Sequence, residues 1–280
     1  MASSPGSRTP RNVLITGGSA GIGEACAERF ARGGDEVWFT YRNGRERAAE
    51  IVSRLVGQYG PRVRAFEFNQ GDPADHERLV AELPGPVDVL VNNAAVGSAT
   101  VGRYADGSPA AQDEAFLRIN ALGPLWLTRA LLPGMLERGR GKVVNISSVG
   151  GGIGVFPGFR LVDGMSKAAL GHFTRQLAAE LVHRPVDVYA VCPGATETGM
   201  FAASTLDALT AAEHAALLAR LPGGRLIQPR EIADTVHWLA GPDSAALHGA
   251  VLDASMGLGV HPGLLTGAAA AHPADLPGGR

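Results

Sequence analysis

Cysteine is scarce in this sequence, since only Cys26 and Cys192 occur among its 280 residues. Both lie in apolar segments that we expect to be buried, which excludes a disulfide scaffold and favours a reducing, cytoplasmic environment. The 8 histidines are scattered, and no histidine, cysteine or acidic residues stand at metal-ligand spacing. We therefore predict no metal site.

Long apolar runs and clusters of one charge are also missing. No stretch approaches the roughly 18 uninterrupted apolar residues of a membrane-spanning helix. The amino-terminal segment MASSPGSRTP lacks the apolar core of a secretory signal. The formal net charge is -2 without a run of lysine or arginine, so neither a nucleic-acid nor a membrane surface is expected. A small neutral or acidic molecule remains the expected partner.

Short apolar runs alternate with longer segments of helical pattern. The predicted strands are Val13–Ile15, Glu36–Thr40, Val63–Phe68, Val87–Val91, Lys142–Ile146, Val186–Val191 and Ala250–Asp253. The predicted helices are Gly21–Arg32, Arg45–Tyr59, Pro73–Glu82, Ala111–Leu136, Ser166–His183 and Pro229–Leu239. Several strands are apolar almost throughout, as strands covered by helices on both faces are. The order predicts an α/β fold with a doubly wound, seven-stranded parallel sheet.

One domain is expected at this length. We predict a Rossmann domain over residues 11–260, with flexible ends at 1–10 and 261–280. Residues 199–224 interrupt the rhythm, because they are rich in alanine and leucine and follow the sixth strand. We interpret them as a helical lid over an apolar substrate, since ligands bind beyond the carboxyl ends of such strands. A dimer contact or an ordinary surface helix pair is the alternative.

A glycine-rich turn joins the first strand to the first helix. Glycine lets a backbone turn tightly and approach a pyrophosphate, whose charge is favoured by the amides at the start of a helix. The strand, turn and helix therefore predict a dinucleotide site. Its expected backbone contacts are Gly17, Ser19, Ala20, Ile22 and Gly23.

Three motifs resemble the compact form of the short-chain dehydrogenase/reductase family over residues 11–258. They are Thr-Gly-x-x-x-Gly-x-Gly from Thr16 to Gly23, Asn92-Asn93-Ala94-Ala95, and the Pro-Gly turn from Pro193 to Thr198. The resemblance implies a homodimer or homotetramer and a nicotinamide cofactor. It implies that Asn93 and Ala94 lie near the ribose, and that the nicotinamide lies near Pro193, Gly194, Thr196 and Thr198.

The end of the second strand bears on the choice of cofactor. NAD-specific members of this family carry an acidic residue there, whereas this sequence reads Thr40-Tyr41-Arg42-Asn43. Arg42 can offer a charged, planar fork to a 2′-phosphate, so we expect NADP(H). A solvated surface arginine is the alternative. The resemblance also places Asn69 and Gln70 at the adenine.

The resemblance implies a reaction site made of asparagine, serine, tyrosine and lysine. Asn120 matches the asparagine that organises a water chain behind the lysine, and Lys167 matches the lysine, which also contacts the cofactor ribose. Ser148 matches the serine that binds the substrate carbonyl, with Ser147 as the nearest alternative. These side chains would hold a carbonyl whose reduction requires both a hydride and a proton.

The tyrosine itself is missing, because Asp163 stands four residues before Lys167. Lysine beside it favours the ionised carboxylate, which cannot donate a proton unless burial raises its pKa. Three routes replace the tyrosine: water relayed through Lys167 and Asn120, a substrate that assists its own protonation, or Tyr104 reaching over the site. We rank them in that order and expect Tyr104 at the rim.

The sequence thus favours NADPH-dependent reduction of a carbonyl on an apolar, polycyclic aromatic substrate, as in ketoreductases of aromatic polyketide antibiotic pathways. The alternatives are a redox-neutral dehydratase or cyclase, and a non-catalytic NADP(H)-binding regulatory protein. A decayed site would have lost several matched residues together. The sequence instead retains Arg42, Asn120, Ser148, Lys167 and Thr198.

Overall fold

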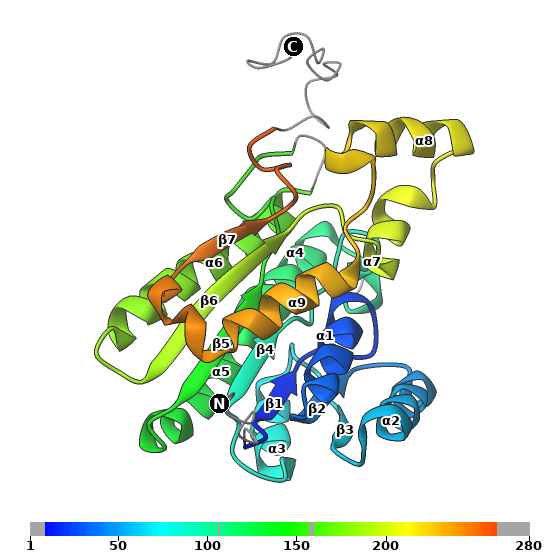
Figure 1. Ribbon diagram of the computed structural model, residues 1–280. Coiled ribbons are helices and arrows are strands. Elements are labelled where there is room, and N and C mark those ends of the chain that lie inside the picture. The colour runs from blue at the N-terminus through cyan, green and yellow to red at the C-terminus, as the bar shows by residue number, and fades with distance from the viewer. Residues whose placement is uncertain (1–8, 106, 157–159, 262–280) are drawn as a thin grey trace, which may run out of the picture.

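The apolar runs of the sequence form the strands of one parallel sheet. The computed structural model describes residues 9–105, 107–156 and 160–261. The two predicted flexible ends therefore lie almost entirely outside the described residues. The strand order is β3-β2-β1-β4-β5-β6-β7, which confirms the predicted doubly wound sheet (Figure 1). The strands are β1 (Asn12–Ile15), β2 (Glu36–Tyr41), β3 (Val63–Glu67), β4 (Val89–Asn92), β5 (Gly141–Ile146), β6 (Val186–Pro193) and β7 (Val251–Ala254).

The order of the strands places the site. The chain runs outward from β1 to β3 and then returns to the other side of β1, where β4 begins the second half of the sheet. The loops that follow β1 and β4 consequently leave in opposite directions. A crevice opens between them at the carboxyl ends of the strands, which is where doubly wound sheets bind ligands.

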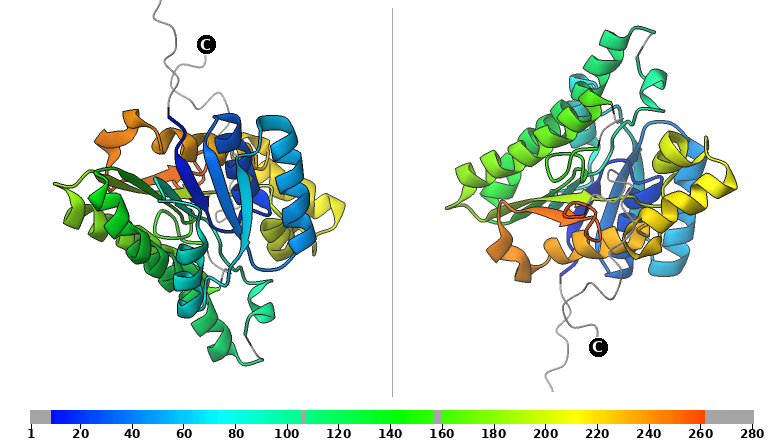
Figure 2. Two further views of the ribbon diagram at one scale, coloured as in Figure 1. Left: turned by 90° about the horizontal axis from the view of Figure 1, so that it is seen from below. Right: turned by 90° about the horizontal axis from the view of Figure 1, so that it is seen from above.

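Helices cover both faces of the sheet (Figure 2). One face packs against α1 (Gly21–Arg32), α2 (Arg45–Tyr59) and α9 (Pro229–Leu239), and the other against α3 (Pro73–Glu82), α5 (Gly123–Glu137) and α6 (Leu161–Leu181). Phe30 and Phe39 are fully buried in the first layer, and Leu14 and Leu127 in the second. Four helices have the bounds that the sequence predicts: α1, α2, α3 and α9.

The predicted helix over Ala111–Leu136 is wrong as a single element. The chain forms α4 (Pro109–Leu117), a π-helical turn η2 (Arg118–Leu122) and then α5. Pro124 has no N–H, so the carbonyl of Asn120 cannot receive the i→i−4 bond of an α-helix. The amide of Gly123 donates instead to the carbonyl of Arg118. A single proline thus breaks the hydrogen-bond ladder beside a predicted site residue.

The start of α6 also differs from the prediction of Ser166, because the helix begins at Leu161. Asp163 and Gly164 lie in its first turn, and both are weak helix formers. They conceal the beginning of the helix in the sequence. The earlier start puts Asp163 on the helix itself, one turn before Lys167.

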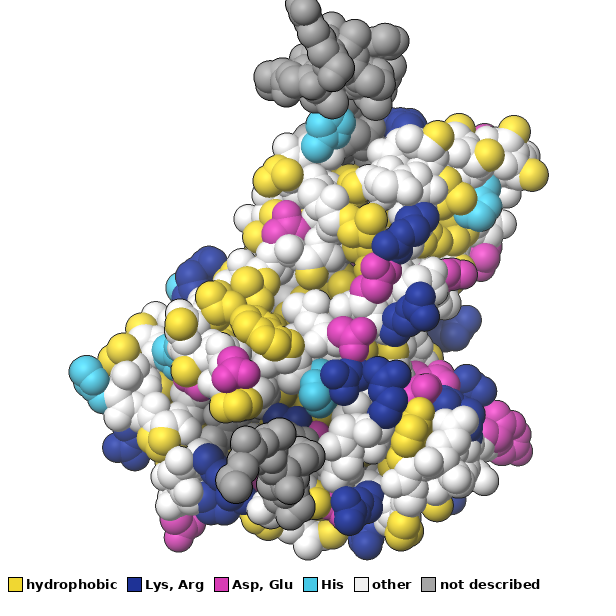
Figure 3. Space-filling model, in the orientation of Figure 1, with side chains coloured by type: hydrophobic (Ala, Val, Ile, Leu, Met, Phe, Trp, Pro, Cys, Tyr) yellow, Lys and Arg dark blue, Asp and Glu magenta, His cyan; other side chains and the backbone are white. Residues whose placement is uncertain are grey.

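Residues 199–224 are helical, as predicted. They form α7 (Gly199–Phe201), a π-helical turn η3 (Ala202–Leu206), α8 (Ala211–Arg220) and a short 3-10 turn η4 (Pro222–Gly224). The segment lies beyond the carboxyl ends of the strands (Figure 1). Figure 3 shows hydrophobic side chains on the outer surface of α8, while Leu218 packs inward against a cluster that contains Val149 and Leu258.

Within the described part of the chain, no helix combines the length and apolar character that a bilayer crossing requires. Cys26 and Cys192 are both buried and free of disulfide bonds. Burial raises the pKa of the Cys26 thiol to about 12. This thiol therefore stays protonated at neutral pH, and the protein is expected to be insensitive to oxidation there.

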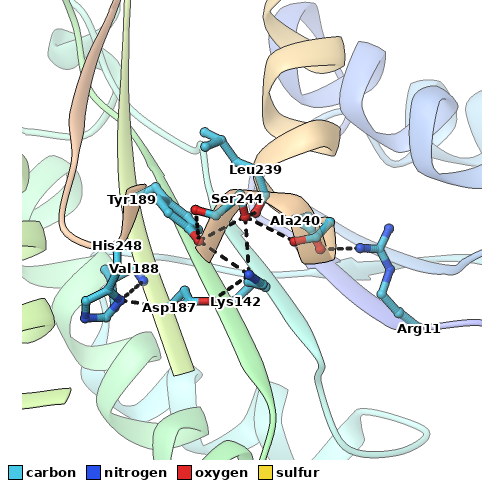
Figure 4. Close-up of polar contacts among 10 residues, drawn as sticks. Arg11, Lys142, Asp187, Val188, Tyr189, Leu239, Ala240, Ser244 and His248 are labelled. Atoms are coloured by element: carbon cyan, nitrogen blue, oxygen red, sulfur yellow. Dashed lines mark hydrogen bonds and ion pairs between the residues drawn. The ribbon is translucent and has the colours of Figure 1, made fainter. Parts of the chain in front are cut away.

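A partly buried polar network joins β5 and β6 to the 3-10 turn η5 (Pro242–Leu247) (Figure 4). Lys142 Nζ lies 2.6 Å from Asp187 Oδ2 and 3.3 Å from Ser244 Oγ. The hydroxyl of Tyr189 donates to the carbonyl of Ser244 at 3.0 Å. His248 Nδ1 lies 3.2 Å from Asp187 Oδ1. The network fastens the ends of β5 and β6 that lie away from the crevice.

Tyr189→Phe is expected to lower the free energy of unfolding by about 1–2 kcal/mol, because the carbonyl of the fully buried Ser244 loses its hydrogen-bond donor. Thermal and urea unfolding measure the change. Tyr59→Phe on α2, outside this network, serves as the control. An unchanged midpoint in Tyr189→Phe would show that the network contributes nothing to stability.

Candidate cofactor and active site

The glycine-rich turn between β1 and α1 is closely packed. Gly17 and Gly21 have φ angles of +67° and +54°, in the left-handed region that favours glycine. A Cβ atom on Gly23 would lie 2.2 Å from the carbonyl oxygen of Gly17. Ala20 precedes α1 and has no side-chain oxygen to cap it, so the first amides of α1 keep their donors for an anion. Ser19 lies in the same turn, and Ile22 lies in the first turn of α1.

Thr16 and Asn93 fasten this turn to the loop after β4. Thr16 Oγ1 accepts hydrogen bonds from the amides of Asn93 at 3.0 Å and Ala94 at 2.9 Å. Asn93 Nδ2 donates to the carbonyls of Thr16 and Gly17. The side chain that the resemblance places near the ribose is therefore used to shape the glycine turn. Ala94 packs directly against Gly17.

Arg42 stands exposed immediately after β2. Its guanidinium carbon lies 5.4 Å from the centre of the Tyr104 ring. Among the described residues, no carboxylate lies within ion-pair distance of Arg42, whereas the neighbouring Arg45 pairs with Glu67 at 3.1 Å. The guanidinium N–H groups of an arginine without a carboxylate partner remain available to bind a phosphate. The observed contact also draws Tyr104 towards the end of β2.

The two residues predicted at the adenine are placed differently. Asn69 is partly exposed and lines a cavity of about 670 Å³ together with Arg42. Gln70 is 5% exposed, and its Nε2 donates to the carbonyls of Ala94 and Ile119 at 2.8 Å. Gln70 therefore braces the wall of the crevice with its amide nitrogen, while its Oε1 has no partner among the described residues. Its contact with the adenine stays a prediction.

The segment after β6 crosses the crevice. Thr198 caps α7 by accepting from the amide of Phe201, and a Cβ atom on Gly21 would lie 3.1 Å from its methyl carbon. On the far side, a Cβ atom on Gly97 would lie 3.1 Å from Met200 Cγ. Pro193 ends β6, Gly194 packs on Ser255, and the hydroxyl of Thr196 donates to the carbonyl of Gly194. Thr198, just before the predicted lid, thus approaches one wall of the crevice, and Met200, at the start of the lid, approaches the other.

The two serines at the end of β5 have different roles. Ser147 is buried, and its hydroxyl donates to the carbonyl of Lys167 at 2.8 Å. Ser148 is partly exposed, and its oxygen accepts from the amide of Gly150 at 3.2 Å. The hydroxyl proton of Ser148 is consequently available for a ligand. This geometry favours Ser148 over Ser147 as the group that binds a substrate oxygen.

Lys167 reaches from α6 to the end of β5, where its Nζ donates to the carbonyl of Ile146 at 3.1 Å. Burial lowers the pKa of Lys167, and Asp163 opposes this change. The ammonium is therefore easier to deprotonate than an exposed lysine. It lies beside the strand end that carries Ser147 and Ser148, as the resemblance implies.

Asn120 is 1% exposed, and the protein itself uses its side chain. Its Oδ1 accepts from the amide of Val96, and its Nδ2 donates to the carbonyl of Val96 and to Ser166 Oγ. The side-chain amide of Asn120 is therefore not free to bind the water chain that the resemblance implies. The backbone carbonyl of Asn120 receives no α-helical hydrogen bond, because Pro124 has no N–H. This carbonyl is the group that Asn120 can offer to a water molecule.

Asp163 lies in the first turn of α6, one turn before Lys167. Burial raises the pKa of its carboxyl group, and this effect outweighs the opposing influence of Lys167, of a hydrogen bond with Ser98 and of Arg160. The sequence alone leads us to expect that lysine would favour the ionised form. The structure instead favours the proton-bearing form relative to an ordinary aspartic acid.

Known proteins share this architecture and much of the sequence. A family model described as enoyl-(acyl carrier protein) reductase matches residues 17–259. A solved structure described as a short chain dehydrogenase/reductase family protein is 32% identical, with a TM-score of 0.73, and covers 88% of this chain and 96% of its own. The chain belongs to the short-chain dehydrogenase/reductase family of oxidoreductases. The predicted family is confirmed.

Two further members of the short-chain dehydrogenase/reductase family are similar to this one. The crystal structure of a variant of the actinorhodin polyketide ketoreductase with NADPH is 33% identical, with a TM-score of 0.79, and covers 89% of this chain and 97% of its own. Acetoacetyl-CoA reductase of Allochromatium vinosum is 33% identical over 254 residues, which are 90% of this chain and 99% of the relative.

Sequence reasoning missed several parts of this family member's site. Ser98, which bonds Asp163, stands in a loop whose course the sequence does not reveal. The contact between Gly97 and Met200 joins segments far apart in the chain. One missed feature did leave a signal, since Pro124 stands four residues after Asn120 and predicts the broken helix there.

Proposed function

We propose that this protein reduces a carbonyl group with NADPH, and that Asp163 replaces the tyrosine that its relatives use. The observation that carries the proposal is the open hydroxyl of Ser148 directly after β5. Lys167 Nζ bonds the carbonyl of Ile146 at the end of the same strand, and Asp163 lies one turn before Lys167 on α6. A hydroxyl donor and a titratable group at the carboxyl edge of a nucleotide-binding sheet are what carbonyl reduction requires.

The residues of the crevice fit NADP(H). The glycine turn leaves no room for a Cβ atom at Gly17 or Gly23, and the uncapped start of α1 suits a pyrophosphate. Arg42 would hold the 2′-phosphate, and Thr198 and Lys167 would lie along the nicotinamide half. When bound, this cofactor supplies the hydride. The relative that was crystallised with NADPH supports the choice.

The proton has a separate source. Ser148 orients the substrate oxygen by donating a hydrogen bond to it. Asp163 holds a proton longer than an exposed aspartic acid, because burial raises its pKa. It delivers that proton to the developing alkoxide, directly or through one water, and the resulting carboxylate is stabilised by Lys167. Tyr104 is not assigned this role, since its ring faces Arg42.

The substrate is expected to be apolar and polycyclic. Beyond the strand ends, an apolar cluster brings together Val149, Leu221 and Leu258, with Phe156, Phe201, Leu206 and Leu218 packed against it. We propose that the partly buried members of this cluster face the substrate, where they would favour a flat aromatic surface. The similarity to the actinorhodin polyketide ketoreductase supports an aromatic polyketide-like ketone as the substrate class.

The proposal is tested by adding polycyclic aromatic ketones and simple ketones to the purified protein with NADPH or NADH, and by following nicotinamide absorbance. NADPH oxidation by the aromatic ketones is expected, and Lys167→Ala is expected to lose most of it. Binding of NADPH without turnover across the panel would favour a redox-neutral or regulatory role. Failure to bind either nucleotide would overturn the cofactor assignment.

A further inference from the structure

We infer that Tyr104 is a specificity-determining residue, whose ring holds the guanidinium of Arg42 in position for a phosphate on the adenosine ribose. The inference rests on the proposed use of NADP(H) and adds a residue to that site. The carrying observation is the distance of 5.4 Å between the guanidinium carbon of Arg42 and the centre of the Tyr104 ring. Arg42 directly follows β2, and Tyr104 lies in the loop between β4 and α4 (Pro109–Leu117).

The loop that carries Tyr104 is well fixed. The carbonyl of Gly97 accepts from the amides of Thr100 and Val101, and Thr100 Oγ1 accepts from the amide of Gly97. Val101 begins a 3-10 turn η1 (Val101–Arg103) and is 1% exposed, in a cluster with Val96 and Phe116. Tyr104 follows this turn directly, and its amide donates to the carbonyl of Val101. The ring is therefore presented from an anchored segment.

Arg42 needs such a partner. It is exposed, and a free arginine side chain samples many rotamers that a bound phosphate would have to arrest. A partner that restricts it beforehand lowers the entropy lost on binding. Other arginines near the end of β2 are restrained by carboxylates, since Arg45 pairs with Glu67 and Arg47 with Glu24.

An aromatic ring suits this task better than a carboxylate does. A carboxylate beside Arg42 would fix the guanidinium but would repel the doubly charged phosphate and neutralise its binding site. The face of a tyrosine ring attracts the cation without carrying a net charge. Tyr104 can therefore order Arg42 and leave its full positive charge to the 2′-phosphate, which NADH lacks.

The test measures nucleotide binding, by titration of fluorescence and by calorimetry, for Tyr104→Leu, Tyr104→Phe, Arg42→Ala and Arg42→Ala with Tyr104→Leu. We expect Tyr104→Leu to weaken NADPH binding about 3- to 10-fold, with NADH binding unchanged. Tyr104→Phe keeps the ring and is expected to bind NADPH like the wild type. In the Arg42→Ala background, Tyr104→Leu is expected to have no further effect.

Two results would overturn the inference. One is an equal loss of NADPH and NADH affinity in Tyr104→Leu, which would indicate a general wall of the crevice. The other is an undiminished effect of Tyr104→Leu in the Arg42→Ala background. A wild-type protein that binds neither nucleotide, or that prefers NADH, would instead refute the proposed cofactor. Thermal unfolding of each variant verifies that it is folded.

Discussion

Asp163→Asn is expected to lower kcat for ketone reduction by about 10²- to 10⁴-fold, the usual contribution of a positioned general acid. Asparagine has almost the same size and can still donate a hydrogen bond, but it has no proton to transfer. The affinity for NADPH should change little, so the loss appears in kcat. Steady-state and single-turnover kinetics at saturating NADPH measure it.

The pH profile distinguishes this role from a structural one. Burial raises the pKa of Asp163, and the protonated form is the active one. The rate in the wild type should therefore be highest at low pH and fall as pH rises through that raised pKa, whereas the residual rate of Asp163→Asn should lack this step.

Asp243→Asn, at an exposed position of η5, is the matched control and should behave like the wild type. If Asp163→Asn keeps its rate and its pH profile, water or the substrate supplies the proton and the assignment to Asp163 is wrong.

Gly23→Ala is expected to lower NADPH affinity by at least about tenfold and to destabilise the fold by about 1–3 kcal/mol. The added carbon would lie 2.2 Å from the carbonyl oxygen of Gly17 and 2.5 Å from Asn93 Nδ2. Both atoms belong to the hydrogen-bonded turn that shapes the crevice, so the turn must move. Nucleotide titration and thermal unfolding measure the two effects.

Gly57→Ala provides the control for Gly23→Ala. Gly57 lies in α2, and a Cβ atom built on it meets no other atom within 4 Å. Alanine there should raise stability slightly, by about 0.5–1 kcal/mol, through its better helix propensity. Normal NADPH affinity in Gly23→Ala would mean that the turn adapts without cost, contrary to the packing argument.

The elements that the sequence predicts best are those whose pattern is local. Helices α1 and α9 follow from spacing and from their flanking residues, and buried strands such as β1 follow from short runs of apolar residues. The break at η2 was missed because the apolar pattern continues across it, although Pro124 signals it. The start of α6 was missed because Gly164 is a weak helix former that tertiary packing nevertheless holds in the helix.

The sequence predicts which residues form the site better than it predicts their hydrogen bonds and pKa values. The motifs identify Ser148 and Lys167. The choice between Ser147 and Ser148, however, depends on which hydroxyl proton is already donated to another group of the protein. For Asp163 the direction of the pKa change depends on a balance between burial and Lys167, which no spacing can give. The roles of Asn93 and Gln70 likewise depend on contacts between distant segments.

Helix α8 has no buried residue, yet it lies beyond the strand ends, over the expected entrance for a substrate. Changes on its exposed face should therefore cost the fold little, and we expect them to alter which substrates can enter. By contrast, Gly23 and Ser147 stand where almost any change disturbs the turn or the strand end. We therefore expect that natural substitutions in α8 can change the substrate while the reacting groups stay the same. Chimeras that exchange residues 211–220 between relatives would be a natural route to new substrate ranges.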